Sequence, residues 1–262
     1  MRHGREMIPP PIAGPGSRIR ECVTLGRHHP TGANGRASMP RPESDAMKLQ
    51  LCYPPEIISG AVARICSQVS DHAPARIAVR SQPWAVANKC AWNVAHAVEK
   101  FGGEAVLGWK VEVWPSVLVN LIGHAVWQKD DGEISCITPQ HEGHICFLRD
   151  DSITFDYRPE SRMGGRSVPL SSHRDVHRFI AVDEAIYAIK AKYPPTSGLL
   201  KLYGQDAENC SALQAEKAEL TRRILVRHHD LEAPCICKSG RKFKKCCRNS
   251  LKQEGALRLK AL

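Results

Sequence analysis

The sequence lacks any apolar run long enough to cross a membrane. The longest such stretch, 117–127, is interrupted by Asn120 and His124 and falls well short of the roughly 18 residues that a spanning helix needs. The first residues contain no apolar core of the kind found in secretory signal peptides, so we expect a cytoplasmic protein without a membrane span. With 42% apolar and 24% charged residues among 262, the composition excludes a collagen and a wholly disordered chain.

Signatures of several common enzyme classes are also missing. The chain has no Gly-x-x-x-x-Gly-Lys-Ser/Thr phosphate loop, no His-Glu-x-x-His pair and no Gly-x-Gly-x-x-Gly dinucleotide fingerprint. It has no Gly-x-Ser-x-Gly nucleophile elbow either. These absences argue against P-loop nucleotide hydrolysis, zinc proteolysis, dinucleotide redox chemistry and serine hydrolysis on an α/β-hydrolase fold.

Basic charge is present, but only at the two ends. Residues 1–46 hold seven Arg against four acids, and residues 231–262 hold nine Lys or Arg against two acids. The middle of the chain, 47–230, has 21 residues of each sign, so the net charge of +10 belongs to the terminal segments. A basic segment of this kind is typical of docking on nucleic acid, on the ribosome or on an acidic protein.

Composition and periodicity divide the chain into four regions. Residues 1–46 are rich in Pro, Gly and Arg without an apolar period, which predicts a disordered basic arm. We expect an α+β domain over 47–192, a linker and helix over 193–230, and a separate C-terminal motif with a basic tail over 231–262.

Apolar spacing predicts the individual elements. Helices are expected over 55–71, 89–101, 174–192 and 206–230. Strands are expected over 105–114, 117–127, 133–138, 144–149 and 152–156, with a Gly-rich loop over 157–172. The predicted fold is therefore helices packed on an antiparallel sheet of about five strands, followed by a helical extension and a small C-terminal motif.

Four of the eleven cysteines crowd into thirteen residues near the C-terminus: Cys235, Cys237, Cys246 and Cys247. The first two are two residues apart, so in an extended stretch their side chains point the same way. Ser239 and Gly240 provide a turn that returns the chain to the second pair. In a chain without a secretion signal, such crowding favours a metal over disulfides, and four thiolates are typical ligands of structural zinc.

The spacing of this segment resembles the SEC-C motif, a small zinc-binding segment found at the C-terminus of the SecA translocase motor and on other bacterial proteins. The shared pattern is Pro-Cys-x-Cys-x-Ser-Gly-x-x-aromatic-Lys-x-Cys-Cys, and Lys238 stands where the family usually has Gly. The resemblance implies zinc and docking to a protein, chaperone or ribosome partner. It does not imply catalysis, because protein ligands fill all four positions. Nucleic-acid binding is weakly supported, since the basic run contains a single aromatic residue, Phe243.

The central region presents a second candidate site. Cys90 opens a predicted helix and His124 lies on a later predicted strand, which is the chain order of papain-like and transglutaminase-like thiol enzymes. A helix N-terminus and an imidazole both favour a reactive thiolate. Over about 84–156 the chain also resembles a group of bacterial proteins with a Cys-x-x-Asn-Val … His-Ala-Val-Trp pattern. Where a third group should orient the imidazole, this sequence has Cys136.

Two functions therefore remain open at this point. The first is a zinc-dependent docking or adaptor protein, which requires only the C-terminal cysteines. The second is a cysteine hydrolase or acyl transferase that uses Cys90 and His124 as a catalytic pair. Cys90 also fits a core position, because it shares a helical stripe with Val94 and Phe101, and free cysteines are among the most buried residues.

Overall fold

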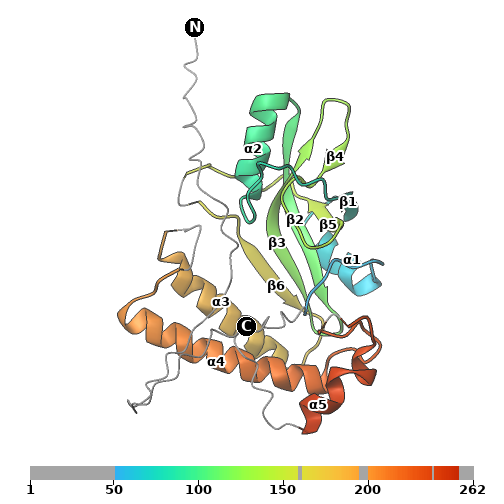
Figure 1. Ribbon diagram of the computed structural model, residues 1–262, viewed down its shortest axis with the longest axis vertical. Helices are drawn as coiled ribbons and strands as arrows, with labels where there is room; N and C mark the ends of the chain where they lie inside the picture. Colours follow the sequence, from blue (N-terminus) through green and yellow to red (C-terminus); the bar gives the residue numbers. More distant parts are fainter. Residues whose placement is uncertain (1–50, 159–160, 195–199, 238, 254–262) are drawn as a thin grey trace, which may run out of the picture.

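The computed structural model describes residues 51–158, 161–194, 200–237 and 239–253, and it confirms the α+β class (Figure 1). The predicted arm 1–46 lies outside these residues. The helices are α1 (Gly60–Ser67), α2 (Cys90–Phe101), α3 (Arg174–Ala191), α4 (Gly204–Arg227), the short 3-10 helix η1 (Phe243–Lys245) and α5 (Cys247–Gln253). The strands are β1 (Ala75–Ala78), β2 (Glu104–Trp114), β3 (Leu118–Gln128), β4 (Ile134–Ser135), β5 (His144–Arg149) and β6 (Gly165–Pro169).

One antiparallel sheet contains all six of these strands, in the order β1-β5-β2-β3-β4, with β6 added along β3. The long strand β3 pairs with β6 through its first half, from Leu118 opposite Pro169, and with β4 through Trp127 and Gln128. A single bridge joins Val79, just after β1, to Cys136, just after β4. The two edges of the sheet therefore meet at this end, and the sheet curls around the side chains between them.

The structure corrects several predicted elements. The helix expected over 55–71 is shorter, because Ser59 caps it by accepting a hydrogen bond from the Val62 amide at 3.3 Å. No strand forms over 152–156. The expected Gly-rich loop instead contains β6, and β1 was not predicted at all.

Two glycines after α2 let the chain turn directly into β2. Gly102 and Gly103 have φ angles of 78° and 80°, the left-handed region that residues with a Cβ rarely adopt. A Cβ at Gly103 would also lie 2.3 Å from the Gln128 carbonyl oxygen. These glycines end the helix and allow β2 to begin within three residues of it.

Helices α1 and α2 pack on the same face of the sheet. Side chains of α1 bury Val62, Ile65 and Cys66 against Val111 and Leu121. Residues of α2, including Cys90, Val94 and Ala97, pack on Ala125 of β3. Because alternate strand residues share a face, these contacts assign the odd-numbered positions of β2 and β3 to the helix-covered side.

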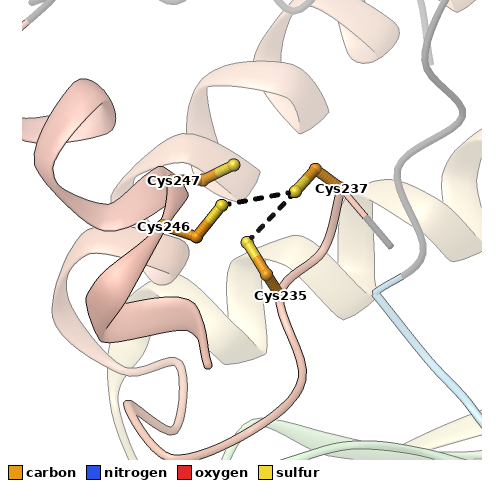
Figure 2. Close-up of side chains that lie close together, drawn as sticks. All are labelled: Cys235, Cys237, Cys246 and Cys247. Carbon is orange, nitrogen blue, oxygen red and sulfur yellow. Dashed lines mark hydrogen bonds between the residues drawn. The ribbon is translucent and has the colours of Figure 1, made fainter. Parts of the chain in front are cut away.

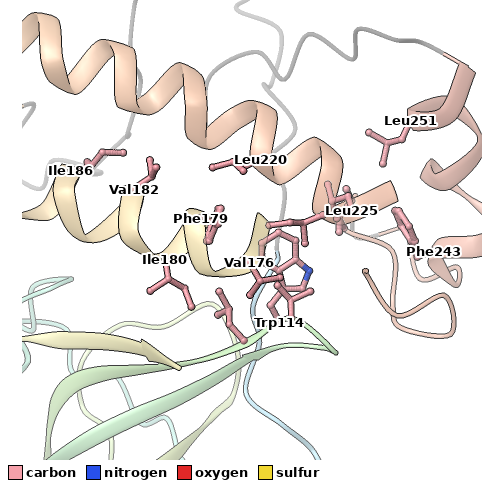
Figure 3. Packing of buried hydrophobic residues seen from close by; sticks show 14 of the residues in the cluster. Trp114, Val176, Phe179, Ile180, Val182, Ile186, Leu220, Leu225, Phe243 and Leu251 are labelled. Atoms are coloured by element: carbon pink, nitrogen blue, oxygen red, sulfur yellow. The ribbon is translucent and has the colours of Figure 1, made fainter. Parts of the chain in front are cut away.

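The largest buried cluster lies where α3 and α4 pack side by side across one end of the sheet (Figure 3). Trp114 and Leu118, at the turn between β2 and β3, enter this cluster from the sheet. Phe243 and Leu251 enter it from the C-terminal segment. That segment therefore shares a core with the helical layer. Among the described residues, no helix has the length and apolarity that a bilayer crossing needs.

Candidate metal centre

The C-terminal segment folds into a tight turn that brings the four predicted thiols together (Figure 2). Pro234 and Lys242 form a bridge, and the Cys235 amide donates to the Arg241 carbonyl at 2.8 Å. Gly240, with a φ of 72°, provides the left-handed residue in this turn. The return chain then forms η1 and α5, and these place Cys246 and Cys247 opposite the first pair.

The four sulfur atoms lie within 4.8 Å of one another. Sγ of Cys237 is 3.4 Å from that of Cys235 and 3.6 Å from that of Cys246. A tetrahedral site with metal–sulfur distances of about 2.3 Å requires sulfur–sulfur separations of about 3.8 Å. The geometry therefore fits a tetrahedral metal ion after shifts of a few tenths of an ångström. Among the described residues, this is the one group of His, Cys, Asp or Glu close enough to hold a metal.

Nearby polar groups favour deprotonation of the two central thiols. Burial opposes ionisation of Cys237, but the Ser239 hydroxyl and the adjacent sulfurs outweigh it and lower its pKa to about 6. A hydrogen bond from Ser239 lowers the pKa of Cys246, and the Arg241 guanidinium donates to the Cys246 sulfur at 3.1 Å. Burial raises the pKa of Cys235 and Cys247, which a bound cation would counteract.

Several basic side chains around the site already form contacts within the protein. Lys242 and Lys244 both form ion pairs with Glu232, and Arg241 contacts the Cys246 sulfur. Phe243 is completely buried. Its ring therefore cannot stack on a nucleic-acid base.

Residues 233–249 match the family model of the SEC-C motif. The matched residues include all four clustered thiols, so the resemblance noted in the sequence is confirmed for this segment. Neither the curated proteins nor the solved structures contain a match to the chain.

The second predicted site is arranged differently from a thiol-enzyme pair. Cys90 is the first residue of α2, as predicted, and its thiol donates to the Met163 sulfur at 3.6 Å. It packs on Ala125. His124, the preceding residue of β3, points to the opposite face of the strand, where its Nε2 lies 3.3 Å from the Cys136 sulfur. Among the described residues, no hydrogen bond links Cys90 with His124.

Burial favours the neutral forms of the Cys90 thiol and the His124 imidazole. It raises the pKa of Cys90, which is 9% exposed, against the opposing effect of nearby backbone amides. It lowers the pKa of His124 to about 3, and the positive charge of Lys110 acts in the same direction. A thiolate–imidazolium pair is therefore disfavoured here. A catalytic role for Cys90 and His124 stays a prediction.

Asn93 and Trp127 of the central sequence pattern, and Trp109 on β2, have structural contacts that account for them. Asn93 exchanges two hydrogen bonds with the Val86 backbone and donates to the Thr138 hydroxyl at 3.0 Å. The Trp127 indole donates to the Gly102 carbonyl. The Trp109 indole donates to Asp150 at 2.8 Å. The pattern thus joins α2 and its flanking loops to the sheet.

Sequence reasoning missed one residue at the edge of the metal segment. His229 is 4% exposed, and its Nδ1 accepts a hydrogen bond from the Trp114 indole at 3.0 Å. The two residues are 115 positions apart, and nothing in the local pattern around either one signals the contact.

Proposed function

We propose that the chain is a zinc-binding SEC-C protein that acts as a docking or adaptor protein. The observation that supports this proposal most directly is the convergence of four thiols in a segment that matches the motif. Zinc suits the site because thiolates in a tetrahedral arrangement are its typical structural ligands. The reducing bacterial cytoplasm, where cysteines stay available for metal, is the compartment we expect.

Two features of the site support a docking role. Four protein ligands fill a tetrahedral metal, so no coordination position remains for a substrate. The apolar side of the motif is buried against the body, whereas Arg241, Lys242 and Lys245 are exposed, although the first two also contact Cys246 and Glu232. We therefore expect the basic side to face the partner, which would be an acidic protein surface or a ribonucleoprotein such as the ribosome. Free nucleic acid is disfavoured by the burial of Phe243.

Metal content is the first test. Purified full-length protein should contain one zinc per chain by elemental analysis, and Cys235→Ser with Cys237→Ser should abolish it. The matched control is Cys66→Ser with Cys146→Ser, which changes two buried thiols outside the motif and should leave zinc content unaltered. Equal metal in the first variant and in wild type would overturn the assignment.

Docking is tested separately by co-sedimentation of the zinc-loaded protein with purified ribosomes. Lys242→Gln with Lys245→Gln should weaken sedimentation while retaining zinc. Arg174→Gln with Lys201→Gln removes the same charge from exposed positions elsewhere and should sediment like wild type. If both variants behave alike, the basic side of the motif is not the docking surface.

A further inference from the structure

The metal segment is attached to the body through a buried aromatic contact. The Phe243 ring meets the His229 ring edge-on, with centroids 4.5 Å apart and planes at 88°. His229 in turn accepts from Trp114, whose ring packs on Phe179 of α3. This chain of rings connects the motif, the end of α4, the β2–β3 turn and α3.

The His229 ring makes few hydrogen bonds of its own. Because Nδ1 accepts from Trp114, the ring proton of the neutral imidazole belongs on Nε2. That Nε2 atom is buried and has no hydrogen-bond partner among the described residues. Burial also lowers the pKa of His229 to about 4, which keeps the ring neutral. The His229 ring is therefore held by packing against Phe243 and by its one side-chain hydrogen bond, from Trp114, while the His229 amide donates to the Ile224 carbonyl at 3.1 Å.

Phe243 is held in place by the fold of the metal segment itself. Its amide donates to the Ala233 carbonyl at 2.9 Å, and the Lys244 amide donates to the Leu231 carbonyl at 3.1 Å. In the chain, Phe243 lies between Cys237 and Cys246, so a metal bound to both would close the loop that carries it. Short segments of this kind obtain their folding free energy from the metal.

We propose that the metal centre is a latch on the body: metal binding seats Phe243 against His229 and thereby holds the end of α4 on the β2–β3 turn. This inference rests on the metal centre proposed above. When the metal leaves, the segment loses its fold, Phe243 leaves the cluster, and the His229–Trp114 bond becomes accessible to water. The helical layer then loosens together with the motif.

Hydrogen exchange of the full-length protein, measured by mass spectrometry before and after removal of zinc by a chelator, tests the latch. Chelation should accelerate exchange at least tenfold in 220–227 and 114–118, in addition to 231–253. The amides of α2 should keep their rates. If acceleration is confined to 231–253, the motif is an independent tail and the latch is wrong.

A variant separates the latch from metal binding. Phe243→Ala keeps all four thiols and should retain one zinc per chain, yet its loaded form should already exchange rapidly in 220–227. Phe147→Ala removes a buried ring from β5, in a different cluster, and should preserve the effect of chelation on 220–227. Should Phe243→Ala fail to fold, Phe243→Leu provides a milder form of the same test.

The two proposals fail in distinguishable ways. Absence of zinc from wild-type protein would overturn the metal centre. One zinc per chain, combined with unchanged exchange in 220–227 after chelation, would overturn the latch alone. Slow exchange in 220–227 of zinc-loaded Phe243→Ala would show that the aromatic contact does not transmit the effect.

Discussion

The thiols of the C-terminal segment and those of the sheet and its covering helices α1 and α2 have different neighbours. Cys235, Cys237, Cys246 and Cys247 converge within one small segment beside a hydroxyl and a guanidinium. In the sheet region, Cys66, Cys90, Cys136 and Cys146 are buried, and burial raises the pKa of each. A cysteine is thus suited to be a metal ligand where polar donors and other sulfurs surround it, and it acts as a small apolar residue where strands and helices cover it.

Introducing a buried charge should produce the largest difference in unfolding free energy between the two groups of cysteines. Cys90→Asp places a carboxylate between α2 and Ala125 without a counter-charge and should cost about 3–5 kcal/mol of unfolding free energy. The same change at Cys237, made in metal-free protein, should stay within about 0.5 kcal/mol, because that position is only half-buried and lies in a segment expected to lose its fold without metal. Urea unfolding measures both values. Similar losses of unfolding free energy at Cys90 and Cys237 would show that the two positions do not differ in this way.

Rates of thiol labelling compare the four motif cysteines with the four buried cysteines of the sheet region, here called the sheet cysteines. In zinc-loaded protein, iodoacetamide should label the four buried sheet cysteines on the order of a hundredfold more slowly than in denaturant, because labelling requires local opening. Chelation should expose the four motif thiols and leave the sheet thiols protected. Peptide mass spectrometry identifies the labelled sites.

The labelling experiment also decides the thiol-enzyme prediction. A nucleophilic Cys90 activated by His124 would react ahead of the other thiols at neutral pH, and His124→Ala would slow that reaction. We expect instead that Cys90 remains protected and that the His124 variant does not change its rate.

Acid should weaken the sheet region through His124. Its folded pKa of about 3 lies below the ordinary value of 6.5, so between these pH values the unfolded chain binds a proton that the folded chain excludes. Stability from this group is complete above pH 6.5 and decreases as the pH falls towards 3. At about 1.4 kcal/mol per pH unit, the loss between pH 6.5 and pH 5 is about 2 kcal/mol.

The slope of the unfolding free energy against pH, measured by urea unfolding at several pH values, should become smaller in His124→Gln. Part of the slope should remain, because burial also lowers the pKa of His229. His141→Gln, at an exposed position, should keep the wild-type slope. An unchanged slope in His124→Gln would place the acid sensitivity elsewhere.

The smallest effect is expected from removal of residues 1–46. Their composition predicts no packed structure, so the melting temperature should not change beyond the scatter of surface substitutions. The truncation also removes Cys22, which simplifies the labelling experiment. A clear fall in melting temperature would show that the arm contributes to the folded body.

Local patterns predicted the parts of the molecule that local forces determine. The ends of α2 and α3 were predicted within about one residue, since Gly102 and Gly103 stop one and Pro194 follows the other. The convergence of the four C-terminal thiols was predicted from their spacing. By contrast, β6 was missed because its half-exposed residues become a strand only by pairing with β3. The placement of His124 and Cys90 on opposite faces of β3 was equally unpredictable, since it depends on which face of that strand α2 covers.

The position of His229 has a consequence for how this motif is reused among proteins. The matched segment begins at residue 233, so His229 and its partner Trp114 both lie outside it. The matched segment therefore contains the four thiols and Phe243, whereas two of the residues that hold the Phe243 ring lie elsewhere in the chain. Transplanting residues 233–249 alone onto another protein would transfer the four thiols and Phe243 without His229 and Trp114.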